Sequence, residues 1–353
     1  MNDVLSFSVR KIAVGLALLI ALASIAFWVN QAIPQDPGNF LLGNVPNPTR
    51  EQIQQANHRL GVDRPALTQY TDFMKQLVRG DLGTSWSTLH YEPGRGVVGQ
   101  PVAGIVLRAA AITGSLVLGG IVLLVALVLP LGPWLASRAG SATDRTVLLI
   151  ALAFVSTHPL VVALLLQLVF GRKLEWLPDQ GYCPFFGSSA YDPFSGSAPC
   201  GGPFAWASHL ALPWLSFSLL FLALYLRQIR TQSLDVLREP FVTVARAKGA
   251  SDQQVLRRHV VPMVLTVAAA MVAMDIGTAL GIALFIEVVF GLPGLGRLLI
   301  TALQGFAGYD RPVIVGIVIV TAAVVILANL VADLLSGVID PRLRLTARRR
   351  AGD

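Results

Sequence analysis

Charged residues are scarce in this chain. They make up 13% of its 353 residues, whereas hydrophobic residues make up 54% and the mean hydropathy is +0.65. An ordinary soluble domain carries about 25% charged residues. A chain so poor in charge cannot cover its apolar residues with a solvated surface, so the composition excludes an ordinary soluble protein and indicates a protein of the lipid bilayer.

Cysteine and the short motifs of catalysis are scarce as well. Two cysteines are too few for a disulfide-rich scaffold or a four-ligand zinc site. The sequence has no Gly-x-x-x-x-Gly-Lys-Ser/Thr phosphate loop, no His-Glu-x-x-His and no Gly-x-Ser-x-Gly. We therefore expect no catalytic residues and no metal site, since the five histidines lie scattered in separate segments: His58, His90, His158, His209 and His259.

The net charge of +7 and the pI near 9.8 raise the question of nucleic-acid binding. The basic residues lie beside apolar runs and not on an aromatic-rich soluble surface, so the excess of positive charge on cytoplasmic loops explains them better. We expect no nucleic-acid partner.

Long apolar runs are what the sequence has in abundance. A bilayer-spanning helix needs roughly 17 to 25 apolar residues. Barrel strands would alternate apolar and polar residues, whereas these runs are continuous. The predicted fold class is an all-α integral membrane protein, a bundle of about six transmembrane helices at residues 12–33, 112–131, 146–170, 208–226, 263–290 and 312–338.

The first run follows Arg10 and Lys11, and Ala21-Leu22-Ala23 resembles a signal-peptidase site. Cleavage there is one alternative. Hydrophobicity continues beyond Ala23 to Trp28 and Val29, which favours an uncleaved anchor with an aromatic residue at the interface.

Arginines and lysines in the short loops predict the orientation. They gather in residues 137–145, in residues 227–262 and after residue 340, so these segments and both chain ends are expected in the cytoplasm. The predicted organisation is an N-terminal tail and first span (1–33), an extracytoplasmic segment (34–101), a transmembrane core (102–340) with an outside loop at 171–207 and a cytoplasmic loop at 227–262, and a basic tail (341–353).

The extracytoplasmic segment contains an amphipathic stretch from residue 49 to residue 78. Thr49 can cap a helix whose first turn holds Glu51, and apolar residues follow at helical spacing. We expect a small helical cap on the membrane surface, in preference to a separate enzymatic domain.

Both cysteines, Cys183 and Cys200, lie in the outside loop at 171–207. Outside the cytoplasm they could pair, and such a bridge would stabilise the loop by roughly 3 kcal/mol. The alternative is a pair of free or buried thiols.

The cytoplasmic stretch from residue 241 to residue 262 is polar and basic between two apolar runs. Gly249 predicts the end of one short helix, and Ser251 with Gln254 predicts a capping box that starts a second helix, after which Pro262 begins the fifth span. Small residues would let another protein approach closely, although the charged residues could also form only a solvated surface.

Ionisable residues inside the spans are few. Asp275 lies near the middle of the fifth span, and His158 precedes Pro159 in the third. Such residues are costly in lipid and often functional. Asp275 could line a water-filled passage or be paired inside the bundle, and His158 could be a hydrogen-bonded interior histidine.

At the cytoplasmic stretch the sequence resembles the permease subunits of bacterial ABC importers, whose loop carries an EAA motif with a following glycine and proline. Ala245, Gly249 and Pro262 match this pattern, while Thr243 and Val244 depart from its Glu-Ala opening. The string ARAKGAS followed by LRRH is similar to the dipeptide, oligopeptide and nickel permease branch. Further similar strings are LGVDRP at 60–65, RGDLG at 79–83, EVVF at 287–290, PGLGR at 293–297 and DPRLR at 340–344.

The resemblance implies a type I importer fold in a bacterial inner membrane. It implies a second homologous permease, two cytoplasmic ATPase subunits that bind ATP and Mg, and an extracytoplasmic substrate-binding protein. It also implies a coupling helix that docks on the ATPase, formed by Ala245, Arg246, Ala247, Lys248, Gly249, Ala250 and Ser251.

Two alternatives from other classes stay open, a proton-coupled secondary transporter and a membrane-embedded enzyme. The transporter would act without an ATPase, and the enzyme would need a cluster of polar residues within the membrane. The solute is undetermined among peptides, nickel chelates, haem and related ligands.

Overall fold

The computed structural model describes residues 2–32, 42, 49–92, 96–187, 200–304 and 309–339. The chain forms two compact units, one of Met1–Thr113 with Pro293–Leu327 and one of Gly114–Leu292 with Ala328–Asp353. The basic tail at 341–353, the start of the extracytoplasmic segment and residues 188–199 of the outside loop lie outside the described residues.

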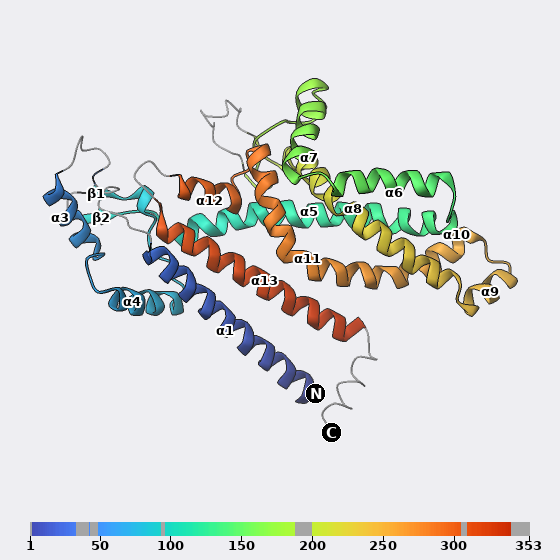
Figure 1. Ribbon diagram of the computed structural model, residues 1–353, viewed down its shortest axis with the longest axis horizontal. Coiled ribbons are helices and arrows are strands. Elements are labelled where there is room, and N and C mark those ends of the chain that lie inside the picture. Colours follow the sequence, from blue (N-terminus) through green and yellow to red (C-terminus); the bar gives the residue numbers. More distant parts are fainter. Residues whose placement is uncertain are drawn as a thin grey trace. The chain divides into compact units, whose positions relative to one another are not determined.

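The first unit contains long helices and a small group of short elements. Their order is α1 (Asn2–Ala32), α3 (Arg50–Leu60), α4 (Ala66–Val78), η1 (Trp86–Thr88), β1 (His90–Glu92), β2 (Gly96–Val98), the start of α5 (Val102–Ser137), α12 (Leu295–Leu303) and most of α13 (Arg311–Ile339) (Figure 1). The strands β1 and β2 pair antiparallel, a short hairpin that the sequence did not predict.

The second unit is built from the remaining helices. They are the rest of α5, α6 (Ala142–Val155), α7 (Pro159–Leu166), the π-helical η2 (Gln167–Lys173), α8 (Pro203–Leu237), α9 (Pro240–Ala247), α10 (Asp252–Val255), the π-helical η3 (Leu256–Val260) and α11 (Val261–Phe290).

Five of the described helices are long and apolar enough to cross a membrane, and a sixth span results if the bent pair α6–α7 counts as one. The predicted bundle of about six transmembrane helices is therefore confirmed. The span predicted at 146–170 is bent, because α6 and α7 meet at 107°. Pro159 at the first position of α7 cannot continue the preceding helix, and His158 caps the new one through the amide of Leu160.

The predicted amphipathic stretch at 49–78 forms two helices. Thr49 caps the first helix as predicted, and its partner Gln52 completes a capping box that was not predicted. Gly61, at φ 68°, then ends α3, and α4 begins after Pro65. A left-handed glycine followed by a proline interrupts a pattern whose apolar spacing alone indicates one helix.

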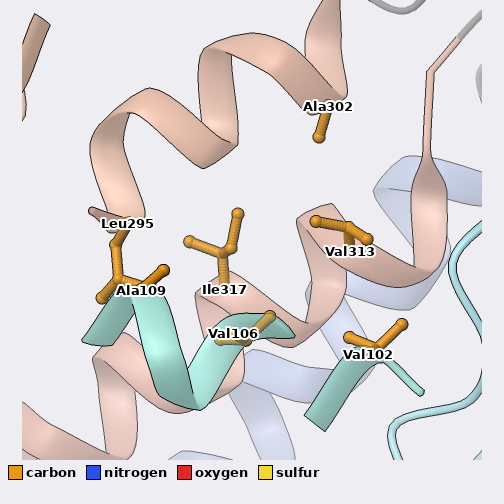
Figure 2. Close-up of a cluster of buried hydrophobic side chains, with 7 residues drawn as sticks. All are labelled: Val102, Val106, Ala109, Leu295, Ala302, Val313 and Ile317. Carbon is orange, nitrogen blue, oxygen red and sulfur yellow. The ribbon is translucent and has the colours of Figure 1, made fainter. Parts of the chain in front are cut away.

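The core of the first unit lies where three helices meet. Figure 2 shows side chains of α5, α12 and α13 pointing toward one another: Val102, Val106, Ala109, Leu295, Ala302, Val313 and Ile317. A second cluster packs Ala23 and Ala26 of α1 against Val315 and Ile319 of α13. All of these side chains except Leu295 are small or β-branched, so van der Waals packing between closely spaced backbones holds this unit together.

Glycines allow the same close approach in the second unit. A Cβ atom on Gly132 of α5 would lie 2.6 Å from Ile229 Cγ2 of α8, and one on Gly119 would overlap the Trp214 ring. Trp214 Nε1 instead donates to the Ser115 carbonyl at 3.0 Å. In a membrane, where hydrophobic burial gives little drive for helix association, such contacts fix the helix pair.

Candidate functional site

The stretch between α8 and α11 forms a sharp corner, which we call the α9–α10 corner (residues 240–255). Gly249 takes φ 90° and donates its N–H to the Arg246 carbonyl at 2.9 Å, and Ala250 N donates to the Ala245 carbonyl at 3.1 Å. A left-handed residue with these bonds is the usual end of a helix, which explains the glycine here. The predicted helix end at Gly249 is confirmed.

The second half of the corner begins at Ser251. Its side chain accepts from Gln254 N, and the Gln254 side chain accepts from Ser251 N at 2.9 Å, so the predicted capping box is confirmed. The prediction that Pro262 begins the fifth span is confirmed in part, because α11 starts at Val261 with Pro262 in its first turn. This helix is not separate from the corner, since η3 joins α10 to α11 and one continuous helix runs from Asp252 to Phe290.

The inner side of the corner is anchored by apolar contacts. Val242 and Val255 are fully buried, and the Phe241 ring lies 5.9 Å from the His259 ring. Because α9 follows α8 after two residues and α10 continues into α11, the corner is joined directly to two spanning helices. A force on the corner would therefore act on both.

The outer side carries the predicted docking residues. Ala247, Lys248, Gly249 and Ser251 are exposed with Arg246, whereas Ala245 and Ala250 are half-buried. Arg246 Nη2 lies 3.0 Å from Asp252 Oδ1, an exposed ion pair across the turn. The structure thus places all seven residues on one compact corner with small side chains, and their docking role stays a prediction.

A buried ion pair that the sequence did not predict supports this unit. Arg230 of α8 donates from Nε and Nη2 to the two oxygens of Asp144, each at 2.6 Å. Asp144 also accepts from Gly140 N at 3.0 Å, and Ser141 caps α6. The residues are 86 positions apart, so no local signal could have identified them.

The two ionisable residues predicted for the pathway have different partners. Asp275 of α11 accepts from the buried Tyr225 hydroxyl at 2.9 Å, while the His158 ring lies edge-on to Phe285 at 5.1 Å. Neither a hydrogen bond nor a ring contact joins Asp275 to His158 among the described residues. Their common role in a pathway stays a prediction.

The two cysteines of the outside loop are joined by a disulfide, with Cα atoms 5.5 Å apart. Gly202 N donates to the Pro184 carbonyl at 3.1 Å and closes the base of the same loop. His209, in the second turn of α8, has Nε2 at 3.5 Å from Cys183 Sγ.

A buried carboxylate organises the part of the first unit between α4 and the start of α13. Asp310, 2% exposed, accepts from Ser85 Oγ at 2.6 Å and from the amides of Trp86 at 3.1 Å and Ser87 at 2.9 Å. We call this group the Asp310 hub. It ties the loop after α4 to the start of α13 across more than 220 residues, and sequence spacing gave no sign of it.

A cavity of about 150 Å³ lies beside this hub, between the ends of α1, α4 and α13. The Arg311 guanidinium lies 5.7 Å from the centre of the Trp86 ring and donates to Gln31 Oε1 at 3.2 Å. Further amide and aromatic side chains line it, among them Asn30, Gln69, Gln76, Phe27 and Phe73. Its mixed lining could hold a few waters or a small polar group.

The family described as "Binding-protein-dependent transport system inner membrane component" matches residues 128–345, which include the α9–α10 corner. A related description for the N-terminal part of such membrane components matches residues 4–93.

Individual relatives match nearly the whole chain. A Brucella ovis protein provisionally named a peptide permease is 31% identical over 97% of this chain and 100% of its own length. A dipeptide transport system permease protein of Alkalihalophilus pseudofirmus is 29% identical over 96% and 99%. An oligopeptide transport system permease protein of Mycobacterium bovis is 29% identical over 93% and 96%.

The fold also matches a solved structure, that of the MetNI methionine ABC transporter in inward-facing conformations. The TM-score is 0.51 at 16% sequence identity, covering 69% of this chain and 100% of the other. At this identity the likeness shows the fold alone.

Proposed function

Since this chain belongs to the family of binding-protein-dependent transport system inner membrane components, we propose that it carries peptides across a bacterial inner membrane, using ATP hydrolysed by partner proteins. It is a multi-pass membrane protein and the permease subunit of a transporter complex. The names of its relatives, which concern peptides, dipeptides and oligopeptides, support the substrate class.

The observation that carries the proposal is the continuity of the α9–α10 corner with α8 and α11. The sequence has no phosphate loop of its own, so the energy for transport comes from two cytoplasmic ATPase subunits that bind ATP and Mg. The small exposed residues at Ala247 and Gly249 let the ATPase surface approach the backbone closely. Movement of the ATPases then turns the two helices as rigid elements.

The remaining partners follow from the same assignment. A second homologous permease completes the pathway, and a substrate-binding protein delivers the peptide from outside. Both chain ends lie in the cytoplasm, as the arginines of residues 137–145 and 227–262 indicate. The Asp310 hub then faces the outside and shapes the surface near which the binding protein docks.

Asp275 is our candidate for a pathway residue. Its carboxylate lies within a spanning helix, is half-buried and has one oxygen held by the Tyr225 hydroxyl. A carboxylate in a membrane segment most often serves a passage or a partner charge. His158 is a weaker candidate, because its ring already caps α7.

Cross-linking tests the docking assignment. Ala247→Cys is expected to form a disulfide with a cysteine placed in the groove of the co-purified ATPase. Ala139→Cys, equally exposed on the predicted cytoplasmic loop before α6, is the matched control and should cross-link less. Preferential cross-linking of Ala139→Cys would contradict the assignment.

Transport measurements test the whole function. The complex reconstituted in vesicles should hydrolyse ATP faster with peptide-loaded binding protein, and Gly249→Asp should abolish this stimulation while the chain still inserts. Peptide uptake by this chain alone, driven by a proton gradient, would instead establish the secondary transporter.

A further inference from the structure

We propose that Cys183, Cys200 and His209 form a binding site for one thiophilic metal ion, Zn²⁺ or Cu⁺, once their disulfide is reduced. The ligand atoms of the three side chains all lie within 4.8 Å of one another. The sequence predicted no metal site because His209 belongs to α8, and only the fold brings it to the loop that carries the cysteines.

The first argument is the state of the imidazole. His209 Nδ1 lies 2.8 Å from the Ala205 carbonyl, which can only accept a hydrogen bond. Nδ1 therefore donates, and in the neutral ring Nε2 carries the lone pair. That atom is the one that faces Cys183 Sγ at 3.5 Å. Metal-binding histidines are commonly oriented by such a bond from the other ring nitrogen to a carbonyl.

The second argument is distance. In a tetrahedral zinc site, bonds of about 2.3 Å to sulfur and about 2.0 Å to nitrogen separate the two ligand atoms by about 3.5 Å. The Cys183 Sγ–His209 Nε2 distance of 3.5 Å already has this value. Two thiolates on the same ion are about 3.8 Å apart. Hence one sulfur–nitrogen edge of the site is preformed, and reduction has only to let the Cys200 sulfur move away.

The third argument is that the site does not depend on the disulfide to stay assembled. The Gly202 N–Pro184 O bond closes the loop base, and Gly181 N donates to the Phe290 carbonyl at 2.9 Å. Gln167 Nε2 donates to the carbonyls of Asp179 at 3.0 Å and Val289 at 2.9 Å. These bonds hold both arms of the loop to helices after the S–S bond is broken.

Burial selects the kind of ion. Cys183 is fully buried, Cys200 and His209 are half-buried, and a row of aromatic rings from Phe185 through Trp206 to Trp214 lies alongside. Two thiolates and one imidazole suit Zn²⁺ or Cu⁺, whereas Mg²⁺ and Ca²⁺ prefer oxygen ligands. The fourth position of a zinc ion is left to water.

The chemistry balances with an external dithiol as reductant. The dithiol gives two electrons and two protons to the Cys183–Cys200 bond and is itself oxidised to a disulfide, which leaves two cysteine thiols. Binding of Zn²⁺ then releases both thiol protons to water, because the thiolates are the ligands. Reoxidation would expel the ion, so the loop holds either a disulfide or a metal.

The test uses tag-free, full-length protein in nanodiscs with Co²⁺ as a spectroscopic probe for the Zn²⁺ site. After phosphine reduction and removal of the reductant, the wild type should bind one Co²⁺ per chain with a thiolate-to-cobalt charge-transfer band that Zn²⁺ abolishes. Oxidised protein should show no such band. Circular dichroism before and after reduction checks that the helices persist.

Variants sharpen the result. Cys183→Ser and Cys200→Ser should each abolish the two-thiolate band, and His209→Asn should weaken binding at least about tenfold, since even the loss of an outer-shell partner costs that much. His58→Asn, at an exposed histidine on α3, is the matched control and should change nothing. The proposal is overturned if the reduced wild type shows no band, if oxidised protein binds equally well, or if His209→Asn and His58→Asn behave alike.

Discussion

Two junctions between loops and spanning helices are built in opposite ways. The α9–α10 corner is shaped by backbone bonds and a capping box, and apart from the buried Val242 and Val255 most of its side chains are exposed. The Asp310 hub is shaped by one buried side chain that accepts from several donors far away in sequence. Exposed side chains of the first junction can therefore be replaced without loss of its backbone conformation. The second junction depends on the carboxylate of Asp310, which cannot be replaced in this way.

The largest expected effect is at the hub. Asp310→Ala removes the acceptor of the buried Ser85 hydroxyl and of the amides of the half-buried Trp86 and the exposed Ser87. A buried donor without an acceptor costs about 1–3 kcal/mol and the more accessible amides add less, so we expect a loss of about 2 kcal/mol in the free energy of unfolding. Thermal unfolding in detergent measures this. Asp310→Asn keeps one acceptor oxygen and should lower the free energy of unfolding clearly less than Asp310→Ala does. Equal losses in the two variants would show that hydrogen bonds to the Asp310 carboxylate do not stabilise this junction.

Gly249→Ala tests the corner, with an expected loss of about 1 kcal/mol from the left-handed backbone. Gly140, at φ 82°, has the same conformation, and a Cβ atom at either glycine would meet open space. Gly140→Ala is thus the matched control with the same strain. Stability should fall equally in both variants, while peptide-stimulated ATP hydrolysis should fall only in Gly249→Ala. A similar fall in both would mean that strain, and not docking, lowers the activity.

Ser251→Ala removes the capping box at the second helix of the corner. The expected cost is about 1 kcal/mol. Since α10 continues into α11, the loss should be confined to the first turn, visible as faster amide exchange at 252–255 and not along the span. Ser141→Ala, at the cap of α6, gives the comparison value for a serine cap in the same unit. Faster exchange throughout α11 would contradict a local role.

The smallest expected effect is at Arg246. Its ion pair with Asp252 is exposed on both sides, so Arg246→Ala should change the free energy of unfolding by less than about 0.5 kcal/mol. If Arg246 lies at the edge of the docking surface, Arg246→Ala should weaken binding of the ATPase, as measured by co-purification at increasing salt concentration. Unchanged ATPase binding would remove Arg246 from that surface.

The sequence predicted features that depend on local contacts, as in the α9–α10 corner, and missed those that depend on distant contacts, as in the Asp310 hub. Local signals predicted the helix cap at Thr49, the capping box at Ser251 and the turn at Gly249, because each depends on residues a few positions apart. Apolar runs predicted the spans for the same reason. The bend at Pro159 was signalled by a proline whose effect a count of apolar residues ignores.

The contacts that sequence could not supply all join distant segments. The Asp310 hub, the Arg230–Asp144 pair and the approach of His209 to Cys183 depend on which helices lie side by side. Each involves a polar group whose type is common on any surface, so its importance becomes visible only when its burial and its partner are known.

The π-helical segment η3 gives the fifth span an unusual property. A π turn takes in more residues than an α-helical turn, so the helix after it is rotated about its axis relative to an uninterrupted α-helix. The π-helical segment therefore changes the rotation, about the helix axis, of the α11 side chains relative to the α9–α10 corner. Within one continuous helix, the corner can face the protein that drives it while the side chains of α11 face the directions that the bilayer and the neighbouring helices require.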